Sequence, residues 1–212
     1  RLNTAGFTTN DTATEDTAQF NLGWACFVPG GCTLTQGYWK THSEFGPAPY
    51  DAGWEEVSGS SVCSDPPGSP NASGEGADVE FFDGGQCWHE IFWDPGKGGN
   101  FYMKLAHQYM AAWLNVNAGA SDDSCISGEF ADAALLLEFY ATPTSGPDYT
   151  IPKRGTDWCD TQLGGSACKS YQSDRQYAVY LNNQLTMYNE GDLSCADHCD
   201  DDGLSALFGT PD

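Results

Sequence analysis

The sequence predicts a mainly helical protein of the α+β class. We expect three to four helices packed into one body, with disulfide-stapled loops and an extended β-strand arm at the N-terminus. Apolar residues recur every three to four positions in the second half of the chain, as on one face of a helix. Before residue 29 they alternate with a period of two, as in a strand. Nine cysteines are spread along the chain, with no CxxC pair and no zinc-finger spacing.

The N-terminal arm is expected over residues 1–28, and it ends in a strand over residues 18–28. Residues 1–17 are polar and hold six threonines, a composition typical of flexible termini. One face of the strand is apolar and is the expected subunit contact: Phe20, Leu22, Trp24, Cys26 and Val28. A lone strand cannot satisfy its backbone groups. It therefore pairs either in a small sheet of its own chain or, as a donated strand, with a neighbouring subunit. The weak strand candidates within the chain are Cys32–Thr35, Val79–Phe82 and Tyr149–Ile151.

The helical domain is predicted over residues 29–191. Apolar stripes and caps indicate four helices: Gln86–Trp93, Phe101–Asn117 ended by Gly119, Gly128–Ala141 capped by Ser127, and a fourth from the capping residue Ser173 to Gly191. Residues 43–76 are rich in Pro, Gly and Ser, which predicts a long loop without a regular element. Residues 192–212 are predicted to be an acidic C-terminal tail.

The charge is strongly acidic, with 30 Asp and Glu against 8 Lys and Arg and a formal net charge of −22. Nucleic acid is not an expected partner, because phosphate binding needs a basic surface. The acidity indicates solubility, with scattered divalent-cation sites as the alternative, so no cofactor other than such a cation is expected. No apolar run approaches the roughly 18 residues of a membrane helix, and therefore no integral membrane segment is expected.

The cysteines indicate disulfides and hence a secreted or cell-surface protein. Near-neighbour spacing suggests Cys63–Cys87, Cys159–Cys168 and Cys195–Cys199, with Cys32–Cys125 tying the motif described below to the body. That leaves Cys26 unpaired, whereas a Cys26–Cys32 bridge with Cys125 free is equally compatible. Nine is odd, so at least one cysteine is free or pairs with another chain. Asn10 and Asn71 begin triplets that fit the N-glycosylation pattern, and Arg1 in place of Met fits a processed product or an expression fragment.

The stretch from Gly31 to His42 joins the arm to the helical body and concentrates its chemistry in few residues. The expected motif core is Cys32, Gln36, Tyr38, Trp39, His42 and, from the longest helix, His107. Tyr38 and Trp39 are expected to pack as aromatic anchors, with Gln36 or Lys40 bonding nearby backbone. His42 and His107 are expected to bond to backbone, and a shared metal ion with a carboxylate as third ligand is the alternative reading. No nucleophile motif, P-loop or HExxH is present, so no catalytic residue and no enzyme activity are expected.

The residues CTLTQGYWKTH at Cys32–His42 resemble the CTxTQGYWKNH motif of a family of secreted bacterial proteins. Leu105–Asn115 (LAHQYMAAWLN) is similar to that family's LAHQLIAAKLN helix, and Leu181–Gly191 to its closing LDxYNNG helix. Thr41 and Trp113 depart from the usual asparagine and lysine. The resemblance implies secretion and association with a cell surface or matrix, but it carries no established activity and no catalytic residues.

The arm from Ala5 to Gly23 also resembles the start of mature TasA-type matrix-fibre proteins, which polymerise by donating an N-terminal strand. The body of those proteins is a β-sandwich, so the resemblance extends only to polymerisation by donation of an N-terminal strand. The function expected from the sequence is an extracellular structural protein whose partners are copies of itself, as a filament or matrix subunit joined by the donated strand. A module that binds cell-surface polysaccharide through exposed aromatic residues is the alternative, and a metal-dependent hydrolase built on His42 and His107 is a third hypothesis.

Overall fold

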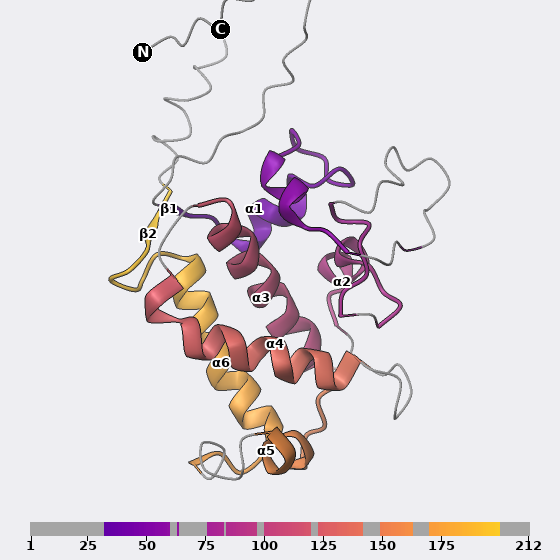
Figure 1. Ribbon diagram of the computed structural model, residues 1–212, viewed down its shortest axis with the longest axis vertical. Helices are drawn as coiled ribbons and strands as arrows, with labels where there is room; N and C mark the ends of the chain where they lie inside the picture. The colour runs from indigo at the N-terminus through magenta and orange to yellow at the C-terminus, as the bar shows by residue number, and fades with distance from the viewer. Residues whose placement is uncertain are drawn as a thin grey trace, which may run out of the picture.

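The computed structural model describes residues 32–59, 63, 76–82, 84–96, 100–119, 123–141, 149–162 and 170–199 (Figure 1). The expected strand at 18–28, the two glycosylation candidates Asn10 and Asn71, and the cysteines Cys26 and Cys168 all lie outside these residues. The predictions made for them stay predictions.

The fold is mainly helical, which confirms the predicted class. The elements in chain order are β1 (Cys32–Thr33), α1 (Gln36–Thr41), the 3₁₀ helix η1 (Ala52–Glu56), α2 (Trp88–Trp93), α3 (Phe101–Asn117), the 3₁₀ helix η3 (Asp123–Cys125), α4 (Ser127–Ala141), α5 (Asp157–Gln162), α6 (Asp174–Asn189) and β2 (Asp197–His198). The four expected helices correspond to α2, α3, α4 and α6. The sequence reading missed α1, α5 and the 3₁₀ helix η1, which interrupts the expected loop over residues 43–76.

Helix α3 is the centre of the body and contacts α1, α2, α4, α6 and β1 (Figure 1). Eleven of its 17 residues are buried, and a helix that is apolar on most of its circumference belongs in a core. Asn100 caps its start, because the Asn100 Oδ1 accepts a hydrogen bond of 3.0 Å from the Tyr102 N–H. Ser173 caps α6 in the same way, as expected, by accepting from the Gln176 N–H at 3.3 Å. In the described part of the chain, no helix combines the length and the apolar character needed to cross a bilayer.

The only sheet in the described residues is small and parallel. Its strands β1 and β2 pair Cys32 with Asp197 and Thr33 with His198. Cys32–Thr35 was thus correctly read as containing a strand, and its partner comes from the C-terminal end of the chain. Of the other two strand candidates, Val79–Phe82 contributes only bridge residues, Val79 and Glu80, with Glu80 paired to Cys87, and Tyr149–Ile151 forms no bridge.

The disulfides correct two of the expected pairs. Cys63 pairs with Cys87 as predicted, with a Cα–Cα distance of 5.8 Å. Cys32 pairs with Cys199 (5.0 Å) and Cys125 with Cys195 (6.0 Å), so Cys32–Cys125 and Cys195–Cys199 were wrong. The reason is the parallel sheet, which places Cys199 directly beside Cys32. Cys159 is also disulfide-bonded, and its expected partner lies outside the described residues.

These bonds also move a domain boundary. Ala196 and Cys199 belong to the hydrophobic core, with 3% and 6% of their surface exposed. Residues 192–199, expected as the start of an acidic tail, are therefore part of the helical body.

Candidate functional site at the motif helix

Helix α1 is formed by the motif and is held at both ends. The Thr35 hydroxyl accepts a hydrogen bond of 3.2 Å from the Tyr38 N–H, which satisfies one free donor of the first turn. His42 caps the other end, and its N–H bonds to the Tyr38 carbonyl. Trp39 is fully buried, so it is the anchor that the sequence predicts. Tyr38 is half-buried and packs edge-on against Trp39 with centroids 5.5 Å apart.

A buried network of amide side chains fastens this motif to the rest of the body. The Asn115 Oδ1 accepts hydrogen bonds of 2.9 Å from the Leu34 N–H and from the Trp39 Nε1–H. Its Nδ2 donates to the Leu34 carbonyl at 2.9 Å and to the Asn189 Oδ1 at 3.0 Å. The Asn189 Nδ2 in turn donates to the carbonyl and Oε1 oxygens of Gln108, both at 2.9 Å. The stretches Cys32–His42, Leu105–Asn115 and Leu181–Gly191 therefore meet in one network whose role is structural.

His42 lies in a second group, outside that network. Its ring stacks on Tyr38 with centroids 3.8 Å apart, and its Nδ1 donates to the Tyr38 carbonyl at 2.8 Å. The Tyr38 hydroxyl donates to the Asp51 Oδ2 at 2.7 Å, and the Asp51 Oδ1 accepts from the Gly53 N–H. Burial raises the pKa of Asp51, although these two hydrogen bonds oppose the shift. The group closes the loop after α1 and offers no nucleophile.

His107 lies at a different place, on the α2 side of α3. Its Nε2 is 2.6 Å from the Ile91 carbonyl, so this nitrogen carries the proton. Burial lowers the pKa of His107, and nearby Lys40 lowers it further, whereas the bond to Ile91 opposes the shift. Both histidines thus bond to backbone, which was the expected reading.

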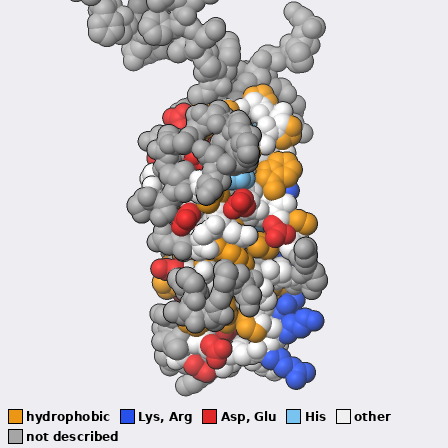
Figure 2. Space-filling model, turned by 90° about the vertical axis from the view of Figure 1, so that its right-hand side faces the viewer, with side chains coloured by type: hydrophobic (Ala, Val, Ile, Leu, Met, Phe, Trp, Pro, Cys, Tyr) orange, Lys and Arg blue, Asp and Glu red, His pale blue; other side chains and the backbone are white. Residues whose placement is uncertain are grey.

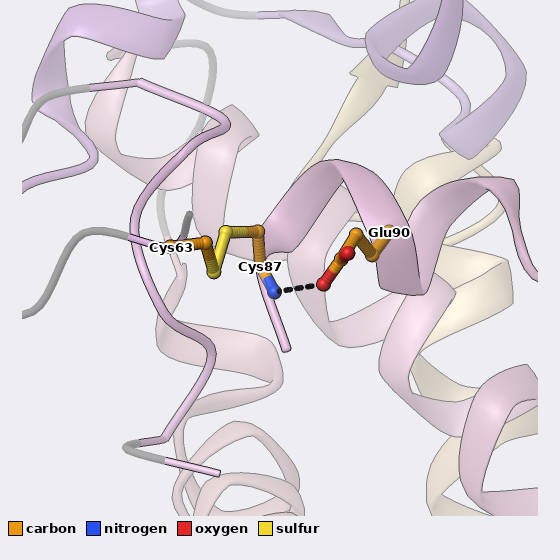
Figure 3. Close-up of side chains that lie close together, drawn as sticks. All are labelled: Cys63, Cys87 and Glu90. Carbon is orange, nitrogen blue, oxygen red and sulfur yellow. Dashed lines mark hydrogen bonds between the residues drawn. A yellow bond between two sulfur atoms is a disulfide. The ribbon is translucent and has the colours of Figure 1, made fainter. Parts of the chain in front are cut away.

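The one group of described residues with metal-ligand spacing is Cys63, Cys87 and Glu90 (Figure 3). Figure 3 shows that the two sulfur atoms form a disulfide, so neither is a thiolate that can bind zinc. The Glu90 Oε2 accepts a hydrogen bond of 3.0 Å from the Cys87 N–H and so completes a capping box at the start of α2. This cluster is structural, and it contains neither His42 nor His107.

A cavity of about 490 Å³ opens beside the motif, and we call it the motif cavity. Its polar lining includes Gln36 and Lys40 from α1, His107 from α3, and Glu190 after α6. Phe92 supplies part of the apolar wall. Lys40 also lies over the ring of neighbouring Trp93, with its Nζ 4.3 Å from the ring centroid. Gln36 and Lys40, one of which was expected to bond nearby backbone, line a cavity that presents an amide, a cation, a carboxylate and an imidazole.

A second hollow, of about 350 Å³, is lined mainly by aromatic and branched side chains. We call it the aromatic slot, and define it by Val57, Val79, Phe82, Trp88, Tyr109 and Trp113. Its rings pack on one another, with centroids 5.3 Å apart for Trp88 and Trp113 and 5.6 Å apart for Phe82 and Tyr109. Ser58, Gly59 and Glu80 also line it, so the hollow is mainly apolar with one charged side chain and suits apolar side chains.

Comparison with family models, curated proteins and solved structures finds no match for this chain. The sequence reading did not single out Trp93 or Glu190 for the motif cavity, or Asn115 for the network. Asn115 had a signal: it is a polar residue inside a stretch whose neighbours Ala111, Ala112 and Leu114 are apolar. Trp93 had none, because its exposure of 43% depends on how α2 packs.

Proposed function

We propose that this protein is an extracellular structural subunit that self-assembles by donating the strand at residues 18–28 to a second copy. The observation that carries the proposal is the aromatic slot, an apolar surface hollow of about 350 Å³. The donated strand would offer it Phe20, Leu22, Trp24 and Val28, which recur on one face. Strand addition of this kind combines main-chain hydrogen bonds with side-chain pockets.

The tether between strand and body limits where the strand can pair within its own chain. Only three residues separate Val28 from Cys32, so the end of the strand stays within about 14 Å of β1. Beside β1, the backbone of Leu34 is bound by Asn115. Trp113 in the slot precedes Asn115 by two residues, which corresponds to about 200° around the helix axis. Trp113 and Asn115 therefore lie on opposite faces of α3. A second copy can present its slot without this constraint.

The cysteines add independent support for a contact between chains. The seven cysteines in the described residues are all disulfide-bonded. Because nine cysteines cannot all pair within one chain, the odd one is Cys26 or Cys168. Cys26 belongs to the apolar face of the strand, where a bridge to another chain would lock the contact.

Substitutions on the two faces of the strand test the proposal in the full-length, oxidised protein. Leu22→Asp places a charge on the apolar face and is expected to abolish assembly in negative-stain electron microscopy and light scattering. Asn21→Asp introduces the same charge on the other face and is the matched control. Trp113→Ala in the slot is expected to weaken assembly as Leu22→Asp does, with the helical signal retained in circular dichroism. Assembly by Leu22→Asp at the control's concentration would refute strand donation.

Binding of extracellular polysaccharide at the motif cavity is the second candidate function. It is favoured by Trp93, a large exposed aromatic side chain at the edge of a cavity with hydrogen-bonding groups of both kinds. An aromatic face beside convergent polar groups suits a hydroxyl-rich ligand with apolar ring faces. Trp93→Ala is expected to reduce retention on polysaccharide columns. Leu135→Ala, at an equally exposed apolar position on α4 (44%), is the control, and equal retention of the two variants would exclude this site.

A further inference from the structure

Basic side chains gather at one end of this acidic molecule. Five Lys and Arg residues lie in the described part of the chain, and four of them are at this end: Lys104, Lys153, Arg154 and Arg175. Lys104 and Arg175 both lie over the ring of Phe101, with the Lys104 Nζ at 5.5 Å and the Arg175 Cζ at 5.2 Å from its centroid. Figure 2 shows Lys and Arg side chains close together near the lower end of the molecule. We call these four residues the basic end.

The backbone holds this group in place. The Asp174 N–H donates a hydrogen bond of 2.9 Å to the Gly155 carbonyl, which sets the exposed Lys153 and Arg154 beside the first turn of α6. Nearby carboxylates only partly offset the cations. Asp157 and Asp160 are exposed, but Asp174 is buried and accepts hydrogen bonds from Tyr140, Trp158 and Cys159.

The opposite end of the molecule is acidic. Figure 1 shows β1 and β2 at the upper end and α5 at the lower end. Glu190, Asp192 and Asp197 are exposed there and flank one backbone contact, because the turn at Gly191 packs directly against His198. We call these three the acidic end.

We propose that the basic end of one copy docks onto the acidic end of the next, so that copies join head to tail. The inference rests on the proposed self-assembly and names the surfaces that meet. Copies with a net charge of −22 repel one another, so they associate where the local charges are opposite. A contact between two different surfaces does not close on itself in pairs, and when its rotation does not close a ring it produces a filament.

The dimensions agree with strand donation. Docking would bring Cys32 of one copy near Phe101 of the next. The slot residues Tyr109 and Trp113 lie about 12 Å and 18 Å further along α3. An extended strand over residues 20–28 would begin within about 14 Å of Cys32 and be about 26 Å long, which is enough to span the slot. One head-to-tail contact therefore permits both interactions.

Neutralising the basic end tests the inference in the full-length, oxidised protein. Lys153→Gln with Arg154→Gln lowers the net charge by two, and we expect the critical concentration for assembly to rise about tenfold. The matched control is Ala131→Glu with Leu135→Glu, which makes the same charge change at exposed positions of α4. Equal critical concentrations for the two variants would overturn the inference.

A charge swap gives a second, sharper test. Lys153→Glu with Arg154→Glu reverses two charges of the basic end, and Asp192→Lys with Asp197→Lys reverses two charges of the acidic end. Each variant alone is expected to stay monomeric, and the mixture is expected to co-assemble because complementary ends then alternate. Failure of the mixture overturns the inference. If Leu22→Asp abolishes assembly while the neutralised basic end leaves it unchanged, strand donation stands without this contact. A wild-type chain that never associates removes both.

Discussion

Asn115 and Asn189 are hydrogen-bonded to each other in the interior, with the Asn115 Nδ2 3.0 Å from the Asn189 Oδ1. They belong to α3 and α6, and neither exposes more than 1% of its surface. Through Asn115 the pair also reaches the motif, which contributes the Leu34 backbone and the Trp39 indole. A satisfied buried network of this kind specifies one arrangement of the three segments, because every alternative leaves a polar group unpaired.

Replacing Asn115 by Leu is expected to lower the free energy of unfolding by about 4 kcal/mol, since buried groups of Leu34, Trp39 and Asn189 lose their partner. Urea denaturation followed by tryptophan fluorescence measures the change. The matched control is Asn117→Leu, two residues later on the same helix, where the side chain is exposed and donates only to the Trp113 carbonyl. The control is expected to stay within about 0.5 kcal/mol of wild type. Similar losses for both would show that the network contributes little.

The Cys32–Cys199 disulfide beside the sheet should stabilise the folded protein more than the Cys63–Cys87 disulfide beside α2. Cys32–Cys199 closes a loop with a sequence separation of 167, and Cys63–Cys87 one with a separation of 24. Chain-entropy arguments give about 5 kcal/mol for the longer loop and about 3 kcal/mol for the shorter. We therefore expect Cys32→Ser with Cys199→Ser to lower the urea midpoint more than Cys63→Ser with Cys87→Ser. The reverse order would mean that the connectivity differs from Cys32–Cys199.

The sequence was sufficient to predict the long helices. It was not sufficient to predict the short helices and the contacts that connect them. Phe101–Asn117 was predicted with the bounds that α3 has, because its apolar stripe runs for 17 residues and Gly119 follows. Helix α1 was missed because six residues that include Gly37, Tyr38 and Thr41 have low helix propensity. It forms because Thr35 caps it and Trp39 is buried against α3. Both interactions depend on the folded structure and cannot be recognised from the local sequence pattern.

The candidate site shows the same limit. Trp39 was expected to be an anchor, but its partner Asn115 lies 76 positions away. Near-neighbour pairing of cysteines failed at Cys32 for the same reason, because the chain returns to β1 only after α6. Local patterns specify elements, whereas the network, the motif cavity and the basic end depend on contacts between distant segments.

Gly191 and Gly119 allow a prediction about the sheet end. Both follow a helix and both have positive φ, 70° and 72°, a backbone region that costs other residues roughly 1–2 kcal/mol. A Cβ on Gly191 would collide with the backbone of His198, whereas one on Gly119 would meet nothing within 4 Å. We expect Gly119→Ala to lower the free energy of unfolding by about 1 kcal/mol and Gly191→Ala by about 3 kcal/mol or more. Equal decreases in the free energy of unfolding, measured by thermal unfolding, would mean that the α6–β2 turn rearranges without loss of stability.

His107 gives stability a pH dependence whose sign is determined by burial. Its pKa in the folded protein lies below the ordinary value of 6.5, so below about pH 6.5 the unfolded chain binds more protons than the folded one. The free energy of unfolding therefore falls as the pH falls from about 6.5 towards the folded pKa, by at most about 1.4 kcal/mol per pH unit. Burial raises the pKa of Glu44 and Asp51, and these two groups act in the opposite direction at lower pH.

The difference between wild type and His107→Gln isolates this contribution. We expect the variant to lose less stability than wild type between pH 7 and pH 5.5, measured by urea denaturation at each pH. Imidazole nitrogen NMR provides the direct measurement, with the proton on the Nε2 that faces the Ile91 carbonyl and a midpoint below pH 6.5. A midpoint above 6.5 would show that His107 is stabilised as a cation, and Asp94, whose charge favours that cation, would then be the carboxylate to test by Asp94→Asn.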